Sequence, residues 1–280
     1  MQQSTPEQAK LMMAGVFNRA AATYGQVGPG YFGYFGQRLV EQAGLAPGMH
    51  VLDVGTGRGA VLFPAAQAVG PSGSVLGIDL AEEMVRATNA EIEQRGVLNA
   101  RAQVMDADHL TFPEAAFDAI TCAFSIFFLS DRDAVLSAFR RLLCPGGRLA
   151  LSIWAEETPT EGARWRWYDD LVKRFLPSSS GSSPLNPGRE MDTSEHLAAR
   201  LTHAGFAEVR VQSETKAFPY ITPEDWWQER WSLFFRVALE RLSSDALVAL
   251  QTEALAHARI MQAQGALITE RNAVYVVARK

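Results

Sequence analysis

The chain has 280 residues, of which 48% are hydrophobic, and its formal net charge is −5 at pH 7. This length and apolar content are typical of one decorated α/β domain with a full core, and they exclude an intrinsically disordered chain. Because proteins that bind nucleic acids through phosphates usually carry a basic surface, the acidic balance predicts no nucleic-acid partner.

Targeting and metal-binding signals are also lacking in the sequence. No apolar run approaches the length that spans a bilayer, and residues 1–7 lack the basic and apolar regions of a secretory signal. Two cysteines, Cys122 and Cys144, make neither a disulfide framework nor a metal site. We therefore expect a cytoplasmic protein with no membrane span and no bound metal.

The N-terminal part of the chain predicts a helical arm. Residues 6–23 repeat apolar side chains at helical spacing, and Pro6 suits the first turn of a helix. A stretch rich in glycine and aromatic residues follows over 24–35. A second helix is expected over about 32–43, so that residues 1–47 form an arm before the first strand.

A glycine-rich turn follows the first strand. The apolar run over 49–52 leads into Asp-Val-Gly-Thr-Gly-Arg-Gly at positions 53–59. Glycine adopts positive φ and lets the backbone approach a ligand closely. A helix that starts near Ala60 points its unpaired N–H groups at the turn. The pattern predicts a site for a nucleoside with a charged or polar tail.

Strands and helices then alternate as far as Trp154. A strand over 74–79 ends in Asp79, a loop follows at 104–107, and further strands are expected over 117–124 and, after a Pro-Gly-Gly turn, up to 154. Such alternation implies a parallel sheet with right-handed crossovers.

The regular alternation stops after Trp154. Residues 155–176 predict an inserted helix with four aromatic side chains, and the Pro-, Ser- and Gly-rich residues 177–188 predict a flexible link. A helix over 193–204 and a strand over 206–215 follow, and a last strand is expected over 272–279.

Between those last two strands lies a long helical excursion. Thr222 and Pro223, followed by two acidic residues, begin a helix that carries Trp226, Trp227 and Trp231. A further helix is expected from Ser243 to about Ala263.

Two interpretations of the glycine-rich turn are open on its residues alone. With Ala60 in the last place, the turn also matches the dinucleotide pattern G-x-G-x-x-G/A. A nicotinamide enzyme would need a pyrophosphate-binding turn and a hydride-handling set such as Tyr-x-x-x-Lys, and the sequence offers no such pair.

Five motifs in order favour the other interpretation. They are the turn with Asp53, Gly55, Gly57 and Gly59, the strand ending in Asp79, the segment 104–107, the strand 117–124, and the Pro-Gly-Gly turn before the strand that ends at Trp154. In this set the chain resembles the class I methyltransferases that use S-adenosylmethionine (SAM), most nearly the UbiE-like branch that acts on small molecules.

The resemblance implies a fold and a cofactor. The fold is α/β, a Rossmann-like seven-stranded class I methyltransferase sheet with helical lid insertions, built as a single domain. Residues 48–154 then form the SAM-binding core, and 155–192 and 216–271 form lid or substrate-cap insertions. SAM is the methyl donor, and S-adenosylhomocysteine is its product. The residues implied in cofactor binding are Asp53, Gly55, Thr56, Gly57, Gly59, Asp79, Leu80, Met84, Asp106, Ala107 and Phe124.

The resemblance also implies the reaction, which moves the SAM methyl group to an O, N or C atom of a small, largely apolar molecule in secondary metabolism or quinone-type biosynthesis. Many relatives carry a His pair after the fourth strand, where this chain has Phe127-Phe128, so a base is missing there. Tyr24 and His109 are the catalytic candidates. Candidates for the acceptor pocket are Tyr24, Phe128, Trp154, Trp227 and Trp231.

One alternative to methyl transfer stays open at this point. Some relatives of the fold bind SAM but catalyse a cyclisation without methyl transfer, and the missing His pair slightly favours that alternative. The expected partner is a small-molecule acceptor, and the chain is a possible homodimer.

Overall fold

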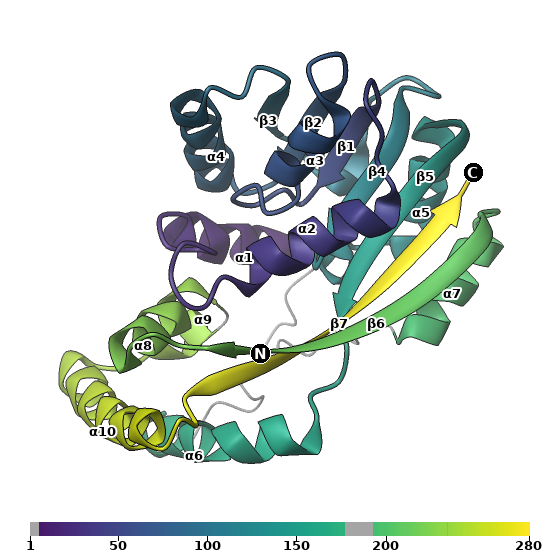
Figure 1. Cartoon of the computed structure of the whole chain (residues 1–280). Coiled ribbons are helices and arrows are strands. Elements are labelled where there is room, and N and C mark those ends of the chain that lie inside the picture. Colours follow the sequence, from purple (N-terminus) through teal and green to yellow (C-terminus); the bar gives the residue numbers. More distant parts are fainter. Residues whose placement is uncertain (1–5, 177–192, 234) are drawn as a thin grey trace.

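The predicted alternation of strands and helices folds into a seven-stranded sheet in the computed structural model, which describes residues 6–176, 193–233 and 235–280 (Figure 1). The strand order is β3-β2-β1-β4-β5-β7-β6. The strands are β1 (His50–Val54), β2 (Ser74–Asp79), β3 (Ala100–Val104), β4 (Phe117–Ala123), β5 (Leu143–Trp154), β6 (Ala207–Pro219) and β7 (Ile268–Arg279). The first five run parallel, and β7 is antiparallel to both of its neighbours.

The register of the central strands brings the predicted site residues to one edge. In β1, Val51 lies opposite Val75 of β2 and Ala119 of β4, and the four residues of β1 after His50 are all buried. A parallel strand that is covered on both faces is mostly apolar, and β1 departs from this pattern at Asp53. The carboxyl ends of β1, β2 and β4 therefore meet at one edge, where open α/β sheets bind their ligands.

Three crossover helices cover the sheet, namely α3 (Leu62–Val69), α4 (Glu82–Arg95) and α5 (Arg132–Leu142). The chain moves from β1 outward to β3 in one direction and from β4 to β5 in the other. Since both kinds of crossover are right-handed, α3 and α4 are expected on one face and α5 on the opposite face. The predicted α/β class and the Rossmann-like sheet are confirmed.

The arm consists of α1 (Pro6–Ala20) and α2 (Tyr31–Ala43). One side of α2 is buried against the sheet and α3, and Gly36 makes this close approach possible. A Cβ built at Gly36 would lie 2.2 Å from the carbonyl oxygen of Ala60. Because α2 is anchored here, the loop that leads into it is held beside the glycine-rich turn.

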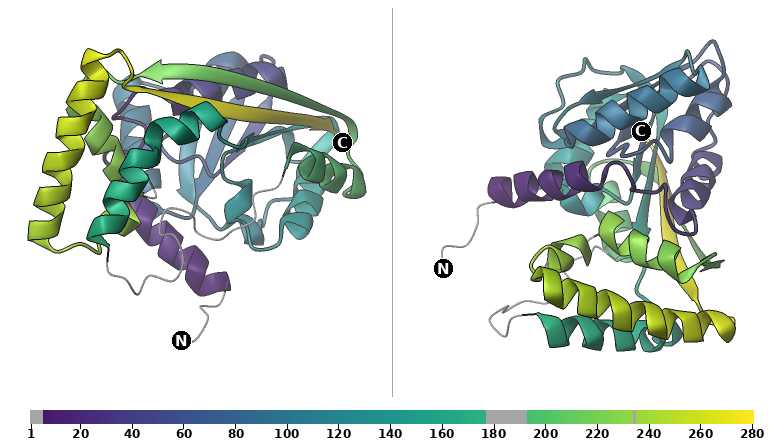
Figure 2. Two further views of the ribbon diagram at one scale, coloured as in Figure 1. Left: turned by 90° about the horizontal axis from the view of Figure 1, so that it is seen from below. Right: turned by 90° about the vertical axis from the view of Figure 1, so that its left-hand side faces the viewer.

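The helices of the C-terminal half form a lid with a core of its own. They are α6 (Pro159–Phe175), α8 (Pro223–Ser232), α9 (Phe235–Leu239) and α10 (Ser244–Ala263), whereas α7 (Ser194–His203) packs on β6 and β7. Figures 1 and 2 show α6, α8 and α10 gathered at one end of the long antiparallel β6–β7 pair. Trp226 is fully buried among them and stacks on Trp165 at a centroid distance of 5.7 Å.

Three boundaries differ from the sequence predictions. β6 runs on to Pro219, and β7 begins at Ile268, because the two strands continue to pair with each other past the end of β5. Residues 216–219 and 268–271, expected in the lid, are therefore strand. The Trp-rich helix ends at Ser232 and a short α9 follows. The predicted flexible link at 177–188 lies outside the described residues.

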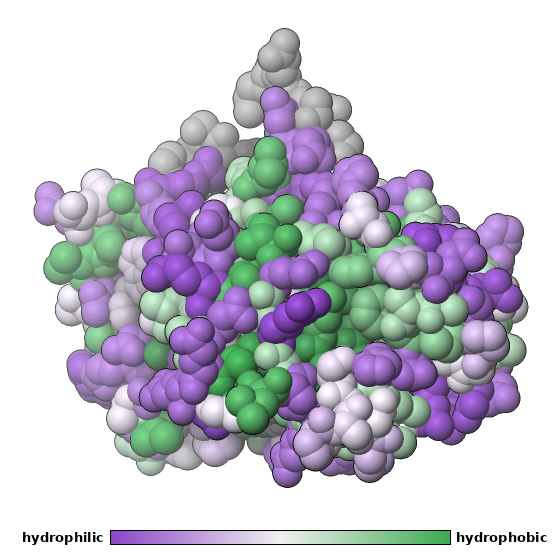
Figure 3. Space-filling model, turned by 90° about the horizontal axis from the view of Figure 1, so that it is seen from above, coloured by the Kyte–Doolittle hydropathy of each residue, from purple (hydrophilic) through white to green (hydrophobic). Residues whose placement is uncertain are grey.

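The molecular surface mixes apolar and polar groups. Figure 3 shows one face on which hydrophobic residues lie in the central part, with hydrophilic residues around them. Among the helices that the structure describes, none has both the length and the apolar character to cross a membrane.

Candidate functional site

The glycine-rich turn is held by hydrogen bonds to both β2 and α4. The Thr56 N–H donates to the Ile78 carbonyl at 3.0 Å, and the Thr88 hydroxyl donates to the Gly57 carbonyl at 2.7 Å. Gly55, Gly57 and Gly59 all have positive φ, as the predicted turn requires. A Cβ at Gly55 would lie 2.4 Å from Ser125 Oγ, so this position accepts glycine alone. The turn is preformed.

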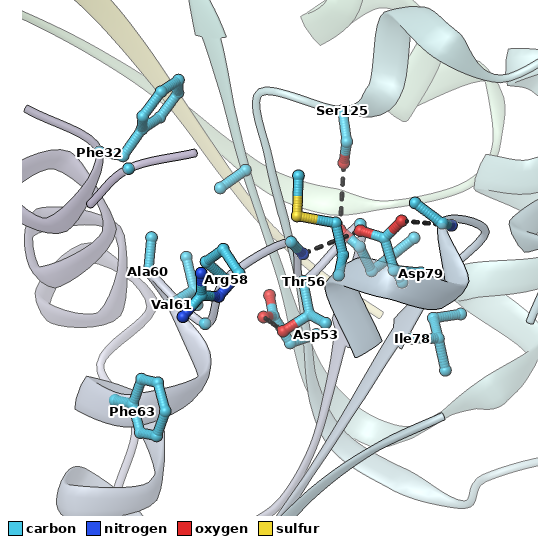
Figure 4. A pocket seen from close by; sticks show the side chains of 18 of the residues that line it. Phe32, Asp53, Thr56, Arg58, Ala60, Val61, Phe63, Ile78, Asp79 and Ser125 are labelled. Atoms are coloured by element: carbon cyan, nitrogen blue, oxygen red, sulfur yellow. Dashed lines mark hydrogen bonds between the residues drawn. The ribbon is translucent and has the colours of Figure 1, made fainter. Parts of the chain in front are cut away.

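Asp79 connects this turn to the end of β2. Its Oδ2 accepts the Gly57 N–H at 2.8 Å, and its Oδ1 accepts the Ala81 N–H at 2.9 Å (Figure 4). Burial raises the pKa of the Asp79 carboxyl, although hydrogen bonds from the Ala81 and Gly57 N–H groups oppose that rise. A carboxylate has about four acceptor positions. One position therefore remains on each oxygen, a geometry that suits two neighbouring hydroxyl groups of a ribose.

Asp53 lies beneath the turn and is only 1% exposed. The Thr56 hydroxyl donates to its Oδ2 at 2.6 Å, and the Thr121 hydroxyl donates to its Oδ1 at 2.8 Å. Burial raises the pKa of Asp53 to about 6, against the effect of these two hydrogen bonds, and the negative charge of Asp79 raises it further. The free protein therefore holds a carboxylate that a nearby cation would stabilise.

A pH dependence of stability follows from Asp53. Its folded pKa of about 6 lies above the unfolded value near 4, so the folded state takes up a proton first as the pH falls. The ionised carboxylate costs on the order of 3 kcal/mol of unfolding free energy above pH 6, and this cost disappears as the pH falls from 6 to 4. Urea unfolding of Asp53→Asn between pH 4 and 8 should lack this component. If the wild type and Asp53→Asn differed in unfolding free energy by the same amount at every pH, the role of Asp53 in this pH dependence would be contradicted.

Asp106, which follows β3, and the arm residue Lys10 lie on another part of the cavity wall. Lys10 Nζ donates to Asp106 Oδ2 at 2.6 Å and to Asp108 Oδ2 at 3.1 Å. The His109 ring also contacts Asp106 Oδ2 at 3.0 Å. Burial acts to raise the pKa of Asp106, but the hydrogen bonds from Lys10, the Asp108 N–H and His109 hold it below its ordinary value. Asp106 is therefore ionised, and it fastens α1 over the cavity.

Lys10→Met is expected to release that fastening. Since Met13, Ala14 and Phe17 of α1 line the same cavity, a detached α1 should let a bound nucleoside leave faster. We expect the dissociation rate of S-adenosylhomocysteine to rise roughly tenfold, because loss of a part-buried ion pair weakens the attachment of α1 over the cavity. Stopped-flow displacement measures this rate. Lys173→Met is the matched control, because Lys173 and Asp170 form an exposed ion pair on the surface of α6. Equal rates in the wild type and the Lys10 variant would contradict the role.

A cavity of about 1070 Å³ joins these groups. The cofactor-binding candidates all lie on its wall: Asp53, Gly55, Thr56, Gly57, Gly59, Asp79, Leu80, Met84, Asp106, Ala107 and Phe124. Its polar groups are the carboxylates and N–H groups of the strand ends. Its volume offers room for a nucleoside with a charged tail.

Aromatic rings close the cavity beside β4. Phe17, Tyr24, Phe32, Phe124 and Phe128 all line it. Tyr24 stacks on Phe32 at a centroid distance of 4.9 Å and meets Phe17 edge-on at 5.6 Å. Phe124 has a φ of +51°, which is strained for a bulky residue and is often found at functional sites. An apolar acceptor and a cation would both suit such walls.

The two catalytic candidates lie in different places. Burial raises the pKa of Tyr24 strongly, so its phenol stays protonated at neutral pH and is no base in the free protein. The His109 side chain is 75% exposed, and His109 is not among the described residues that line the cavity. Phe127 and Phe128 stand after β4, as the sequence shows, and Phe127 is buried in the core.

The three tryptophans expected in the acceptor pocket are not among the described residues on the cavity wall. Trp154 stands behind it, stacked on Phe124 at 3.8 Å. Trp227 is 5% exposed within the lid core, and Trp231 packs against that core. A role for these rings in binding an acceptor stays a prediction.

Sequence reasoning missed Lys10, Phe17 and Ser125, which the fold brings to the cavity. The Ser125 hydroxyl donates to the Val54 carbonyl at 3.0 Å and so joins β4 to β1. The sequence carries no signal that singles out Lys10, because α1 holds other charged residues such as Glu7 and Arg19. The others lie far from the glycine-rich turn in sequence, and no spacing connects them with it.

Comparisons with known proteins agree with this geometry. Residues 51–147 match the family model described as "Methyltransferase domain". The chain is 33% identical over 273 residues to the nocamycin O-methyltransferase of Saccharothrix syringae, covering 94% of this chain and 97% of that protein. It is also 33% identical to the ubiquinone/menaquinone biosynthesis C-methyltransferase UbiE of Shewanella sp. (strain W3-18-1), over 68% of this chain and 75% of that one.

Among solved structures, the [4+2]-cyclase SpnF superposes with a TM-score of 0.57 and covers 100% of this chain and 98% of its own, at 19% identity. That likeness shows the fold alone. The full-length similarity to a methyltransferase and the matching domain decide the family. This chain belongs to the class I S-adenosylmethionine-dependent methyltransferases of the small-molecule type.

Proposed function

We propose that this enzyme methylates an O, N or C atom of a small, largely apolar acceptor in secondary metabolism or quinone-type biosynthesis. The observation that carries the proposal is a single cavity in which the Asp79 carboxylate and the Gly57 turn lie at one end and a group of aromatic rings at the other. The names of the two relatives, an O-methyltransferase for nocamycin and a C-methyltransferase of quinone biosynthesis, support the same class of reaction.

The polar end of the cavity fits the methyl donor, and each group has a proposed part. Asp79 holds the ribose hydroxyls, and Asp106 and the Ala107 N–H hold the adenine. Leu80 and Met84 pack against the adenine ring. Asp53 and neighbouring carbonyl groups hold the ammonium of the methionyl part, which lies beside Gly55, Thr56, Gly59 and Phe124. SAM supplies an electrophilic methyl group on its sulfonium.

Alignment and exclusion of water are the main contributions of the chain to the rate. Holding two reactants in line can lower a barrier by about 7–11 kcal/mol. Tyr24 and Phe128 form the walls at which the acceptor and the sulfonium meet. Because the Tyr24 phenol is held protonated and phenylalanine takes no proton, the acceptor should arrive already ionised or with a free lone pair.

A labelled-donor assay tests the reaction. The enzyme is incubated with trideuteromethyl SAM and a panel of apolar acids, phenols and amines, and the masses of the products are measured by mass spectrometry. Methyl transfer predicts a product heavier by one labelled methyl group. A cyclase, the second candidate, gives a product without the label, and that result would overturn the proposal. The predicted cytoplasmic location and homodimer stay predictions.

A further inference from the structure

Arg271, which no prediction from the sequence singled out, is a partly buried cation with no ion pair to a described acidic residue. Its Nε is buried with no hydrogen-bond partner, and no ion pair joins its guanidinium to any acidic residue that the structure describes. Burial acts to lower the pKa of Arg271, but the nearby Tyr31, Tyr220 and Glu229 raise it, so the charge is retained. A guanidinium offers five N–H donors, and leaving the buried Nε–H of Arg271 unpaired away from water is costly.

Glu229, the acidic residue whose charge raises the pKa of Arg271, is already paired with other groups. Glu229 Oε2 accepts the Tyr220 hydroxyl at 2.5 Å and pairs with Arg230, which also donates to the Tyr220 oxygen at 3.0 Å. The described cluster therefore holds two guanidinium groups and one carboxylate. One positive charge is left over, and it belongs to Arg271.

The neighbouring strand adds a further positive charge. Arg271 lies directly opposite Lys216 in the antiparallel β6–β7 pair, and residues opposite each other share one face of the sheet. Like charges in this position destabilise a sheet. Lys216 is exposed and its ammonium lies 3.9 Å from the centroid of the Tyr34 ring, so it adds to the positive charge of this face without pairing with Arg271. An anion beside Arg271 would offset the excess of positive charge.

Arg271 is not among the described residues on the cavity wall, and it lies behind the aromatic end of the cavity, next to rings that pack against that wall. The register places it two residues beyond Ala273, the partner of Trp154, and so just past the carboxyl end of β5. Its guanidinium carbon is 4.8 Å from the centroid of the Tyr31 ring and 6.0 Å from that of Trp154. Trp154 in turn stacks on Phe124 of the cavity wall. Cation–π contact offsets part of the charge but satisfies none of its N–H groups.

We propose that Arg271 binds an anionic oxygen of the methyl acceptor, so that the preferred substrates are apolar organic acids, carboxylates or enolates. This inference rests on the proposed function and narrows its substrate class. It agrees with the need for an acceptor that arrives ionised, and it gives the unpaired guanidinium a partner. Arg271 is then a specificity-determining residue rather than a base or a nucleophile.

Paired probes test the proposal. Benzoate, 2-naphthoate and anthraquinone-2-carboxylate, each with its neutral carboxamide, are titrated by calorimetry into enzyme saturated with S-adenosylhomocysteine. The wild type is expected to bind at least one acid roughly tenfold or more tightly than its amide, as charge-assisted hydrogen bonds to Arg require. No preference for any acid over its amide would overturn the proposal.

Three variants assign the preference to the residue. Arg271→Gln should abolish it while leaving amide binding within about twofold, and Arg271→Lys should retain part of it. Arg210→Gln, which changes an exposed arginine elsewhere on β6, should keep it in full. An unchanged preference in Arg271→Gln would contradict the assignment.

Stability gives a second readout that separates recognition from a structural role. Because Arg271→Gln removes an unpaired cation, its melting temperature without ligand should equal or exceed that of the wild type. A large fall in melting temperature, together with an unchanged preference for acids over amides, would show that Arg271 has a structural role. The labelled-donor assay is run on the same samples, since an acid preference without methyl transfer would refute the proposed function and still support the anion site.

Discussion

Asp79→Ala is expected to weaken binding of S-adenosylhomocysteine by about 10²- to 10⁴-fold in a calorimetric titration. Two hydrogen bonds to a charged carboxylate, each about 1.5–3 kcal/mol, are lost with the side chain. The Gly57 N–H and the Ala81 N–H also lose their acceptor, so the turn is loosened as well. Asp79→Asn keeps one acceptor oxygen and should give a smaller loss.

The matched control for this experiment is Asp118→Ala. Asp118 lies at the start of β4, on the opposite edge of the same sheet, where its Oδ2 accepts the His50 N–H at 2.8 Å. That variant should bind S-adenosylhomocysteine as the wild type does. Equal affinity of the wild type and Asp79→Ala would show that the ribose is held elsewhere.

Gly57→Ala is expected to abolish cofactor binding in a protein that still folds. The nearest atom to a Cβ built at Gly57 is Cε1 of Tyr24, at 3.7 Å, so the free protein has room for it. Since both residues line the cavity, the added methyl group points into the space that the cofactor needs. We expect an affinity loss of at least about 100-fold, measured by calorimetry, with a destabilisation of roughly 1–2 kcal/mol from the positive φ.

Gly146→Ala separates the two effects. Gly146 has a φ of +75°, a Cβ there would meet no heavy atom within 4 Å, and the residue is not on the described cavity wall. This control should share the loss of stability and keep the affinity. If Gly57→Ala bound S-adenosylhomocysteine normally, the turn would not be in contact with the cofactor.

Short sequence motifs were enough to predict the sheet and the polar residues at the carboxyl ends of its strands. The turn at 53–59 and the acid at the end of β2 are defined by short stretches of sequence, because a strand followed by glycines has few other structures available. The parallel order followed from the alternation of strands and helices. Once these elements are correct, the right-handed crossovers bring Asp53, Asp79 and Asp106 to one cavity.

Contacts between distant segments could not be predicted in this way. Lys10 meets Asp106 across 96 positions of the chain, and no spacing rule connects them. Trp227 and Trp231 of α8 were expected at the acceptor pocket because they are aromatic, yet Trp227 is buried inside the lid and Trp231 packs against the lid core. The unpaired state of Arg271 depends on which acidic groups other cations have already taken, which only the folded structure shows.

A crystal structure of the enzyme with S-adenosylhomocysteine tests the central claim most directly. The account predicts both ribose hydroxyls on the carboxylate of Asp79, the adenine beside Ala107 and Met84, and the thioether sulfur facing the aromatic end of the cavity. A ribose bound away from Asp79, or a nucleoside bound outside this cavity, would contradict it.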